Sequence, residues 1–170
     1  MGDGQPTKRA PLTIRALTDA DRQAIAAWHY ADDLSLYDPG PGALELRAPD
    51  HVALLSEDGT LLGFGTMGAD ARVAGGRYDS AETVLDLGVG LCPAHVGQGH
   101  GPAALEALIA RALDQGSATR LRVTIAAFNG RATALAHKLG FQPSHRFTRT
   151  SDGRAFVQYE RPVTSEPATR

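Results

Sequence analysis

Hydrophobic and polar residues alternate along several short stretches of the chain, and each such stretch predicts a β-strand with one buried face. Two of these stretches flank the pair Asp58-Gly59, which is typical of a tight hairpin turn. A last hairpin is predicted around Ser151-Asp152-Gly153. The predicted strands are 12–17, 51–55, 61–66, 83–91, 121–126, 141–149 and 155–160.

Between the strands, apolar residues recur every three to four positions in three segments and predict amphipathic helices. Thr18 is suited to cap the first helix, which carries Trp28 on its apolar face. The second helix is predicted from Pro102 to about Gln115, and the third begins after Asn129. The order β-α-β-β-β-α-β-α-β-β predicts a mixed α/β (α+β) fold, with a mostly antiparallel sheet of six to seven strands and helices on both faces.

The length of 170 residues predicts one domain, which we place at 12–161. The ends, 1–11 and 162–170, are rich in Gly, Pro, Thr and charge, and we expect them to be disordered tails. No apolar run approaches the roughly 20 residues that span a bilayer. The N-terminus also lacks the apolar segment of a signal peptide. We therefore expect a cytoplasmic protein with no membrane partner.

Charge and cysteine content exclude further classes. The chain has 17 basic and 19 acidic residues, a formal net charge of −2, so it lacks the basic excess of a nucleic-acid-binding protein. The single cysteine, Cys92, cannot form an internal disulfide or a cysteine-based zinc site. The histidines show no spacing typical of metal ligands, and we expect no metal.

The most informative stretch is a glycine-rich loop between a strand and a helix. Gly97, Gly99 and Gly101 alternate, and Pro102 follows at a position suited to the first helical turn. Bare amides at the positive end of a helix favour an anion, most obviously a phosphate. A Walker loop is excluded, because Pro102-Ala103 replaces Lys-Ser/Thr, and a dinucleotide fingerprint fits weakly. A plain glycine turn that caps a helix is the remaining alternative.

Together with two further segments, this loop resembles the GNAT superfamily of acyl-CoA-dependent N-acyltransferases. The segments are Asn129-Gly130-Arg131-Ala132 and the helix end Leu139-Gly140-Phe141. The loop matches the family motif Arg/Gln-x-x-Gly-x-Gly/Ala at Gly99 and Gly101. It departs from the motif at the first position, where Val96 stands. The order of elements also agrees, and the resemblance covers nearly the whole predicted domain.

The resemblance implies an N-acetyltransferase that moves an acetyl group from acetyl-CoA to a primary amine in a ternary complex. It places the pyrophosphate on the loop amides and the pantetheine arm between the fourth and fifth strands. An acyl-CoA sensor without catalysis and a nucleotide-binding module are alternatives. The implied donor-binding residues are Leu91, Cys92, Val96, Gly97, Gln98, Gly99, His100, Gly101, Pro102, Asn129 and Lys138.

The fourth predicted strand has two different faces. Its leucines and valine share the core face, whereas Asp86, Gly88, Gly90 and Cys92 lie on the other. Two glycines on one face suggest a bulge or the close approach of a ligand. By the resemblance, Asp86 is the candidate general base, acting directly or through water. The alternative is that Asp86 pairs with an arginine or caps the sheet.

The acyl acceptor is expected near the first helix and the loop that follows it. Trp28, Tyr30 and Tyr37 are the candidate acceptor-binding residues there, since aromatic rings beside carboxylates suit a cationic amine. For Trp28 the alternative is a core position. The family often carries a tyrosine that protonates the leaving thiolate, but Ala136 stands at that position. The acceptor, a small-molecule or peptide amine, is left open, as is a homodimer.

Overall fold

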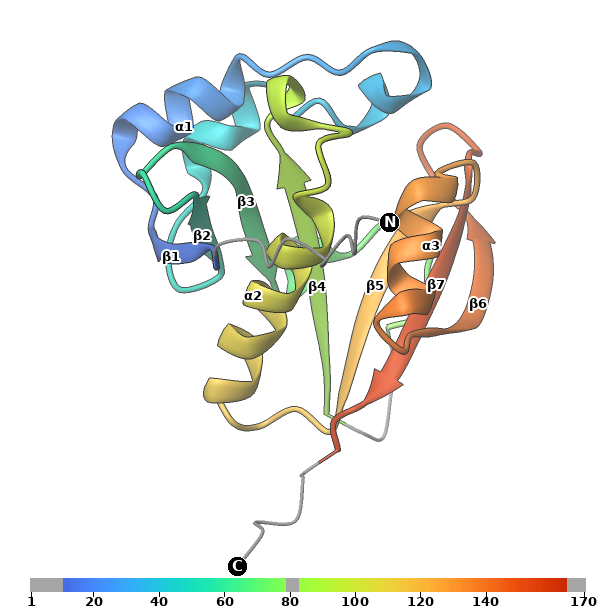
Figure 1. Ribbon diagram of the computed structural model, residues 1–170. Helices are drawn as coiled ribbons and strands as arrows, with labels where there is room; N and C mark the ends of the chain where they lie inside the picture. Colours follow the sequence, from blue (N-terminus) through green and yellow to red (C-terminus); the bar gives the residue numbers. More distant parts are fainter. Residues whose placement is uncertain (1–10, 79–82, 165–170) are drawn as a thin grey trace, which may run out of the picture.

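The computed structural model describes residues 11–78 and 83–164, which form a seven-stranded mixed sheet with helices on both faces (Figure 1). The strand order is β1-β2-β3-β4-β5-β7-β6, and every neighbouring pair is antiparallel except β4–β5. The strands are β1 Thr13–Ala16, β2 His51–Leu55, β3 Leu61–Met67, β4 Val84–Leu91, β5 Arg120–Ala126, β6 Gln142–Thr148 and β7 Ala155–Pro162. The predicted fold class is confirmed.

Within residues 11–78 and 83–164, three α-helices and four short 3₁₀ turns connect the strands. The helices are α1 Asp19–Ala26, α2 Gly101–Asp114 and α3 Gly130–Lys138. The turns are η1 Asp32–Tyr37, η2 Gly40–Glu45, η3 Ala69–Ala71 and η4 Pro93–His95. None of the described helices is long and apolar enough to cross a membrane.

The structure corrects two predicted boundaries. Thr18 caps α1 as predicted, with Asp21 completing a capping box, but the helix ends at Ala26, so Trp28 follows it instead of lying on its face. The predicted C-terminal tail begins too early, because β7 includes Pro162 and the Val163 N–H donates to the Thr119 carbonyl at 2.8 Å. Residues 1–10 and 165–170 of the two predicted tails lie outside the described residues.

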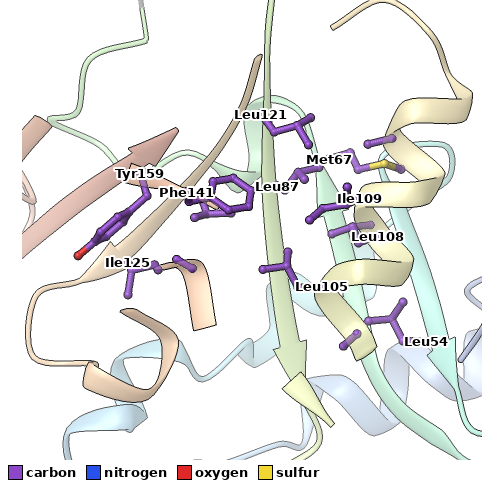
Figure 2. Close-up of a cluster of buried hydrophobic side chains, with 14 of the residues drawn as sticks. Leu54, Met67, Leu87, Leu105, Leu108, Ile109, Leu121, Ile125, Phe141 and Tyr159 are labelled. Atoms are coloured by element: carbon purple, nitrogen blue, oxygen red, sulfur yellow. The ribbon is translucent and has the colours of Figure 1, made fainter. Parts of the chain in front are cut away.

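Apolar residues of the sheet alternate between its two faces. In β2, Leu54 packs beneath α2, whereas the neighbouring Ala53 packs with Ile25 of α1 and with η2 on the opposite face. Figure 2 shows the largest core cluster, in which Leu105, Leu108 and Ile109 of α2 lie over β3 and β4. Leu87 of β4 and Phe141 beside α3 join this core, each at most 1% exposed. The period-2 alternation of the strands therefore creates two helix-bearing faces.

The two parallel strands at the centre of the sheet, β4 and β5, separate about halfway along their length (Figure 1). The pairing of β4 with β5 runs from Val84↔Arg120 to Leu87↔Val123. Beyond that point β4 continues to Leu91 and β5 to Ala126, each paired only with its outer neighbour. We call the region between residues 88–91 and 124–126 the splay.

Glycines let β3 and the side chains around it approach β4 closely. A methyl group added at Gly90 would lie 2.5 Å from Cε1 of Phe64, so the aromatic ring occupies the space over this glycine. A methyl group at Gly63 would lie 2.5 Å from the Gly90 carbonyl oxygen. At Gly90 the group that approaches is thus a protein side chain, and not the ligand that the sequence suggested.

Replacing Gly63 by alanine is expected to destabilise the protein by about 1–3 kcal/mol, because the new methyl group meets backbone that cannot move aside. Urea unfolding would measure the change in the free energy of unfolding. Gly42→Ala is the matched control, since a methyl group there has no neighbour within 4 Å. Equal stability of Gly63→Ala and the control would contradict the close packing of β3 against β4.

Candidate active site

The splay exposes backbone groups of both strands, and two tyrosines reach them. The N–H of Cys92 bonds to Leu62 on β3 at 2.8 Å, so the carbonyl of the preceding Leu91 faces the splay. The hydroxyl of Tyr30 donates to that carbonyl at 2.5 Å. On the other side, the N–H of Ala126 donates to the hydroxyl of Tyr37 at 3.1 Å. Two of the three predicted acceptor residues therefore meet the splay.

The third predicted acceptor residue, Trp28, lies in the core, which was the alternative interpretation of this residue from the sequence. Its side chain is buried with α1 and η2, and its ring lies 6.0 Å from that of Phe64. Asp38 fixes the loop after α1, because its carboxylate accepts from the Tyr30 N–H at 2.8 Å. Burial raises the pKa of the Tyr30 hydroxyl well above its ordinary value. Tyr30 therefore stays protonated at neutral pH and acts as a hydrogen-bond donor.

The glycine-rich loop presents a row of free amides at the start of α2. Gly97 and Gly99 have φ angles of +79° and +80°, a left-handed conformation that favours glycine. In the described part of the chain, the N–H groups of residues 97–100 have no acceptor. The Gln98 side chain instead anchors the loop, donating to the Ala94 carbonyl at 3.0 Å. This geometry is that of an anion site at a helix N-terminus.

Not every predicted loop residue offers an amide. The Val96 N–H already bonds to the Pro93 carbonyl at 3.4 Å, and Pro102 has no N–H. His100 stands at the N-cap position of α2, but its side chain makes no capping hydrogen bond. Its ring lies edge-on to that of His95. The free amides are thus those between Val96 and Gly101.

Helix α3 brings a cation to the loop that the sequence reasoning missed. A methyl group added at Gly97 would lie 3.2 Å from Nη1 of Arg131, so the guanidinium group lies next to the loop backbone at this glycine. Within the described residues Arg131 has no ion-pair or hydrogen-bond partner. It lies in the first turn of α3, inside the motif that was quoted for Asn129. The motif containing Arg131 was therefore recognisable in the sequence, but the sequence did not indicate that its side chain lies over the loop.

The two predicted donor-binding residues of this segment, Asn129 and Lys138, lie at opposite ends of α3. Asn129 caps the helix with its side-chain oxygen, which accepts from the Ala132 N–H at 3.2 Å, and its amide nitrogen has no described partner. Lys138 lies exposed in the last turn, about 10 Å along the helix axis from Arg131. The structure therefore brings Asn129 and Arg131, but not Lys138, toward the first turn and the loop.

Asp86 lies at the centre of a buried charge network. It is 1% exposed, and it pairs across the β4–β5 ladder with Arg122, whose Nε and Nη2 donate to its two oxygens at 2.6 and 2.9 Å. Nε of Arg72 donates to the same carboxylate at 2.9 Å. Both guanidinium groups also lie over the ring of Tyr78, at 4.7 and 5.1 Å from its centroid.

This network favours the second interpretation of Asp86, that of a partner for arginine. Burial alone would lower the pKa of Arg122, but the hydrogen bonds and charge of Asp86 raise it above its ordinary value. Three N–H donors occupy most of the acceptor positions of the carboxylate, and with 1% exposure it has almost no solvent contact. The ion pair instead fixes the register of β4 and β5 directly before they separate.

Two further polar features lie near the splay. The hydroxyl of Thr124, at the first position of β5 beyond the last pair with β4, is buried and has no described hydrogen-bond partner. A cavity of about 340 Å³ opens between η2, β2, β3 and η3 on the face that carries α1. Its lining includes Glu45, from the predicted acceptor loop, and Thr66 on β3. In the described part of the chain, no cluster of His, Cys, Asp and Glu could hold a metal ion.

Comparison with known proteins identifies the family. A model of the acetyltransferase (GNAT) family matches residues 15–141. The chain belongs to this family. It is therefore an acetyltransferase by family, and GNAT proteins act with acyl-CoA donors. No curated protein matches the sequence significantly.

Solved structures share the GNAT fold across the whole domain. An acetyltransferase (GNAT family) from Bacillus anthracis is 14% identical with a TM-score of 0.69, covering 91% of this chain and 96% of that one. A phosphinothricin acetyltransferase from Sinorhizobium meliloti, in complex with acetyl-CoA, is 20% identical with a TM-score of 0.67, covering 94% and 92%. A putative acetyltransferase from Salmonella typhimurium, also with acetyl-CoA, is 20% identical with a TM-score of 0.58, covering 95% and 99%.

Replacing Arg122 by methionine is expected to lower the free energy of unfolding by about 3–5 kcal/mol, because it removes the main partner of a buried carboxylate. The double variant Asp86→Leu/Arg122→Met is expected to recover most of that loss, since it removes both charges. Arg111→Met, on the exposed side of α2, is the control and is expected to change stability by less than about 0.5 kcal/mol.

Chemical denaturation measures these differences, and acetyl transfer by the double variant separates the two interpretations of Asp86. A folded double variant that retains turnover supports a purely structural carboxylate. A folded double variant without turnover would contradict it and assign Asp86 to the chemistry.

Proposed function

We propose that this GNAT protein is an N-acetyltransferase that moves the acetyl group of acetyl-CoA to a primary amine by direct attack in a ternary complex. The observation that carries the proposal is the alignment of two sites along one path. Free amides at residues 97–100 suit a diphosphate, and the splay begins at Gly88, on the strand that leads into that loop. A donor with a diphosphate at one end and a thioester at the other matches this arrangement.

Each part of the donor has a protein counterpart. The loop amides and the Arg131 guanidinium bind the diphosphate, because both place positive charge on one side of the loop. The backbone of Leu91 lines the path of the pantetheine arm, while Cys92, whose N–H bonds to β3, contributes only contact. The free amide nitrogen of Asn129 donates to the arm from the opposite side. Lys138 is assigned to the adenosine end on the resemblance alone.

The chemistry needs little beyond positioning. The neutral amine attacks the thioester carbon with its lone pair, a C–N bond forms, and the C–S electron pair leaves with sulfur. The attacking nitrogen then gives up a proton, which passes through water to the departing thiolate, and the products are an N-acetyl amine and the free thiol of CoA. An alkyl amine has a pKa near 10.4 and a thiol near 8.5, so deprotonation of the amine is the harder requirement.

Tyr30 is assigned to hydrogen bonding in the splay, not to proton transfer. Its raised pKa keeps the hydroxyl protonated, and that one proton is donated to the Leu91 carbonyl, so Tyr30 holds the backbone of the splay in place beside the thioester. A thiol of pKa about 8.5 leaves without a dedicated acid. This accounts for Ala136 at the position where many relatives carry a tyrosine.

The function is tested by heat stability and turnover. Acetyl-CoA at saturating concentration is expected to raise Tm by several degrees, more than equal concentrations of ATP or NAD, because ligands that bind only the folded state stabilise it. With a panel of primary amines, release of free thiol is expected to exceed that of the amine-free reaction. Greater protection by ATP or NAD would contradict the donor assignment, and binding without thiol release would favour the sensor alternative.

The matched pair Arg131→Met and Arg111→Met, tested in the same assay, localises the diphosphate. Both remove an exposed arginine from a helix, but only Arg131 lies over the loop. We expect Arg131→Met to weaken acetyl-CoA binding about tenfold, the value of one charge-assisted hydrogen bond, and Arg111→Met to leave it unchanged. Equal affinity of the two variants would remove Arg131 from the donor site.

A further inference from the structure

The cavity beside the splay combines an apolar wall with two acidic side chains. Its volume is about 340 Å³, and Leu46 and Phe64 supply apolar surface. Glu45 and Asp70 bring two carboxylates, with no arginine or lysine in the lining. A hollow of this character favours an organic cation that has a hydrophobic chain.

Thr66 presents a hydroxyl to the cavity. Thr66 is 7% exposed and lines the cavity, but its hydroxyl has no hydrogen bond within the described residues. Buried polar side chains nearly always have a partner in the protein, an ordered water or a ligand. Thr66 therefore offers a hydroxyl to a water or a polar ligand in this cavity.

His51 holds Asp70 at the rim. His51 is 5% exposed, and its Nδ1 lies 3.2 Å from the Arg47 nitrogen and 3.0 Å from the Arg47 carbonyl oxygen. Its Nε2 lies 3.3 Å from Oδ2 of Asp70. The imidazole thus orients the carboxylate at the rim. The Phe64 ring adds a face suited to a cation.

The cavity is one strand away from the splay. Thr66 pairs with Gly88, the first residue of β4 beyond the last pair with β5. Neighbouring strands lie about 4.8 Å apart. A methyl group at Gly88 would meet only the Cβ atoms of Ala71 and Thr66, at contact distances of 3.7 and 3.9 Å, so there is space for at least a methyl group over this glycine.

We infer that this cavity binds the acceptor of the proposed transfer, and that the acceptor is an alkyl diamine. One ammonium group lies between Glu45 and Asp70, and the chain passes over Gly88 to place the second nitrogen at the thioester. The group held by the carboxylates is not the nucleophile, because nearby negative charge keeps it protonated and its lone pair unavailable. The inference rests on the proposed function for the attack, but not for the binding.

The test is isothermal calorimetry of 1,6-diaminohexane, with n-hexylamine as a probe of similar length and one charge. We expect the diamine to bind the protein at least tenfold more tightly than the monoamine, and Asp70→Asn to remove this preference. Thr66→Val is expected to weaken diamine binding without lowering Tm, since its hydroxyl has no partner in the protein. Glu57→Gln, an exposed carboxylate in the β2–β3 turn, is the control and is expected to change neither.

Turnover and donor binding separate this inference from the proposed function. With acetyl-CoA, Asp70→Asn is expected to raise KM for the diamine with little change in kcat, while the affinity for acetyl-CoA stays the same. Equal binding of diamine and monoamine, or an Asp70→Asn variant that keeps the preference, would overturn the inference even if acetyl-CoA binds. Loss of acetyl-CoA binding in the wild type would overturn the proposed function, while calorimetry of the diamine would still decide the cavity.

Discussion

The ion pair between Asp86 and Arg122 determines where the sheet opens. It spans the only parallel strand pair in the described sheet and lies one residue before the last paired position of β4. A buried charge pair is costly unless both partners are fully hydrogen-bonded, and here a second arginine and an aromatic ring complete the set. The ion pair accordingly fixes the register between β4 and β5. The strands stay together up to the ion pair and separate directly after it.

The functional groups follow from that separation. Once β4 and β5 part, each has backbone groups without a sheet partner, and such groups must be satisfied. Tyr30 and Tyr37, from the segment after α1, bond to one group on each strand. The same strand then leads into the loop of free amides, so the splay and the proposed diphosphate site share β4, and the proposed acceptor cavity lies one strand away at β3.

Local rules were sufficient for most of the fold. Period-2 alternation, the Asp58-Gly59 turn and the caps Thr18 and Asn129 are encoded over a few residues, and these elements are confirmed. The site was harder to predict because it depends on contacts between distant segments. Nothing near Arg131 in the sequence indicates that it overlies Gly97, and nothing near Thr66 indicates a cavity. The pairing of Asp86 was foreseen only as an alternative, since the partner lies 36 positions away.

The most direct measurement is a crystal structure of the protein grown with acetyl-CoA. The account predicts diphosphate oxygens within hydrogen-bond distance of the amides of residues 97–100, and the pantetheine arm between residues 88–91 and 124–126. It also predicts that Asp86 and Arg122 remain paired in that complex. A coenzyme bound elsewhere on the surface, with the splay filled by side chains, would contradict the account.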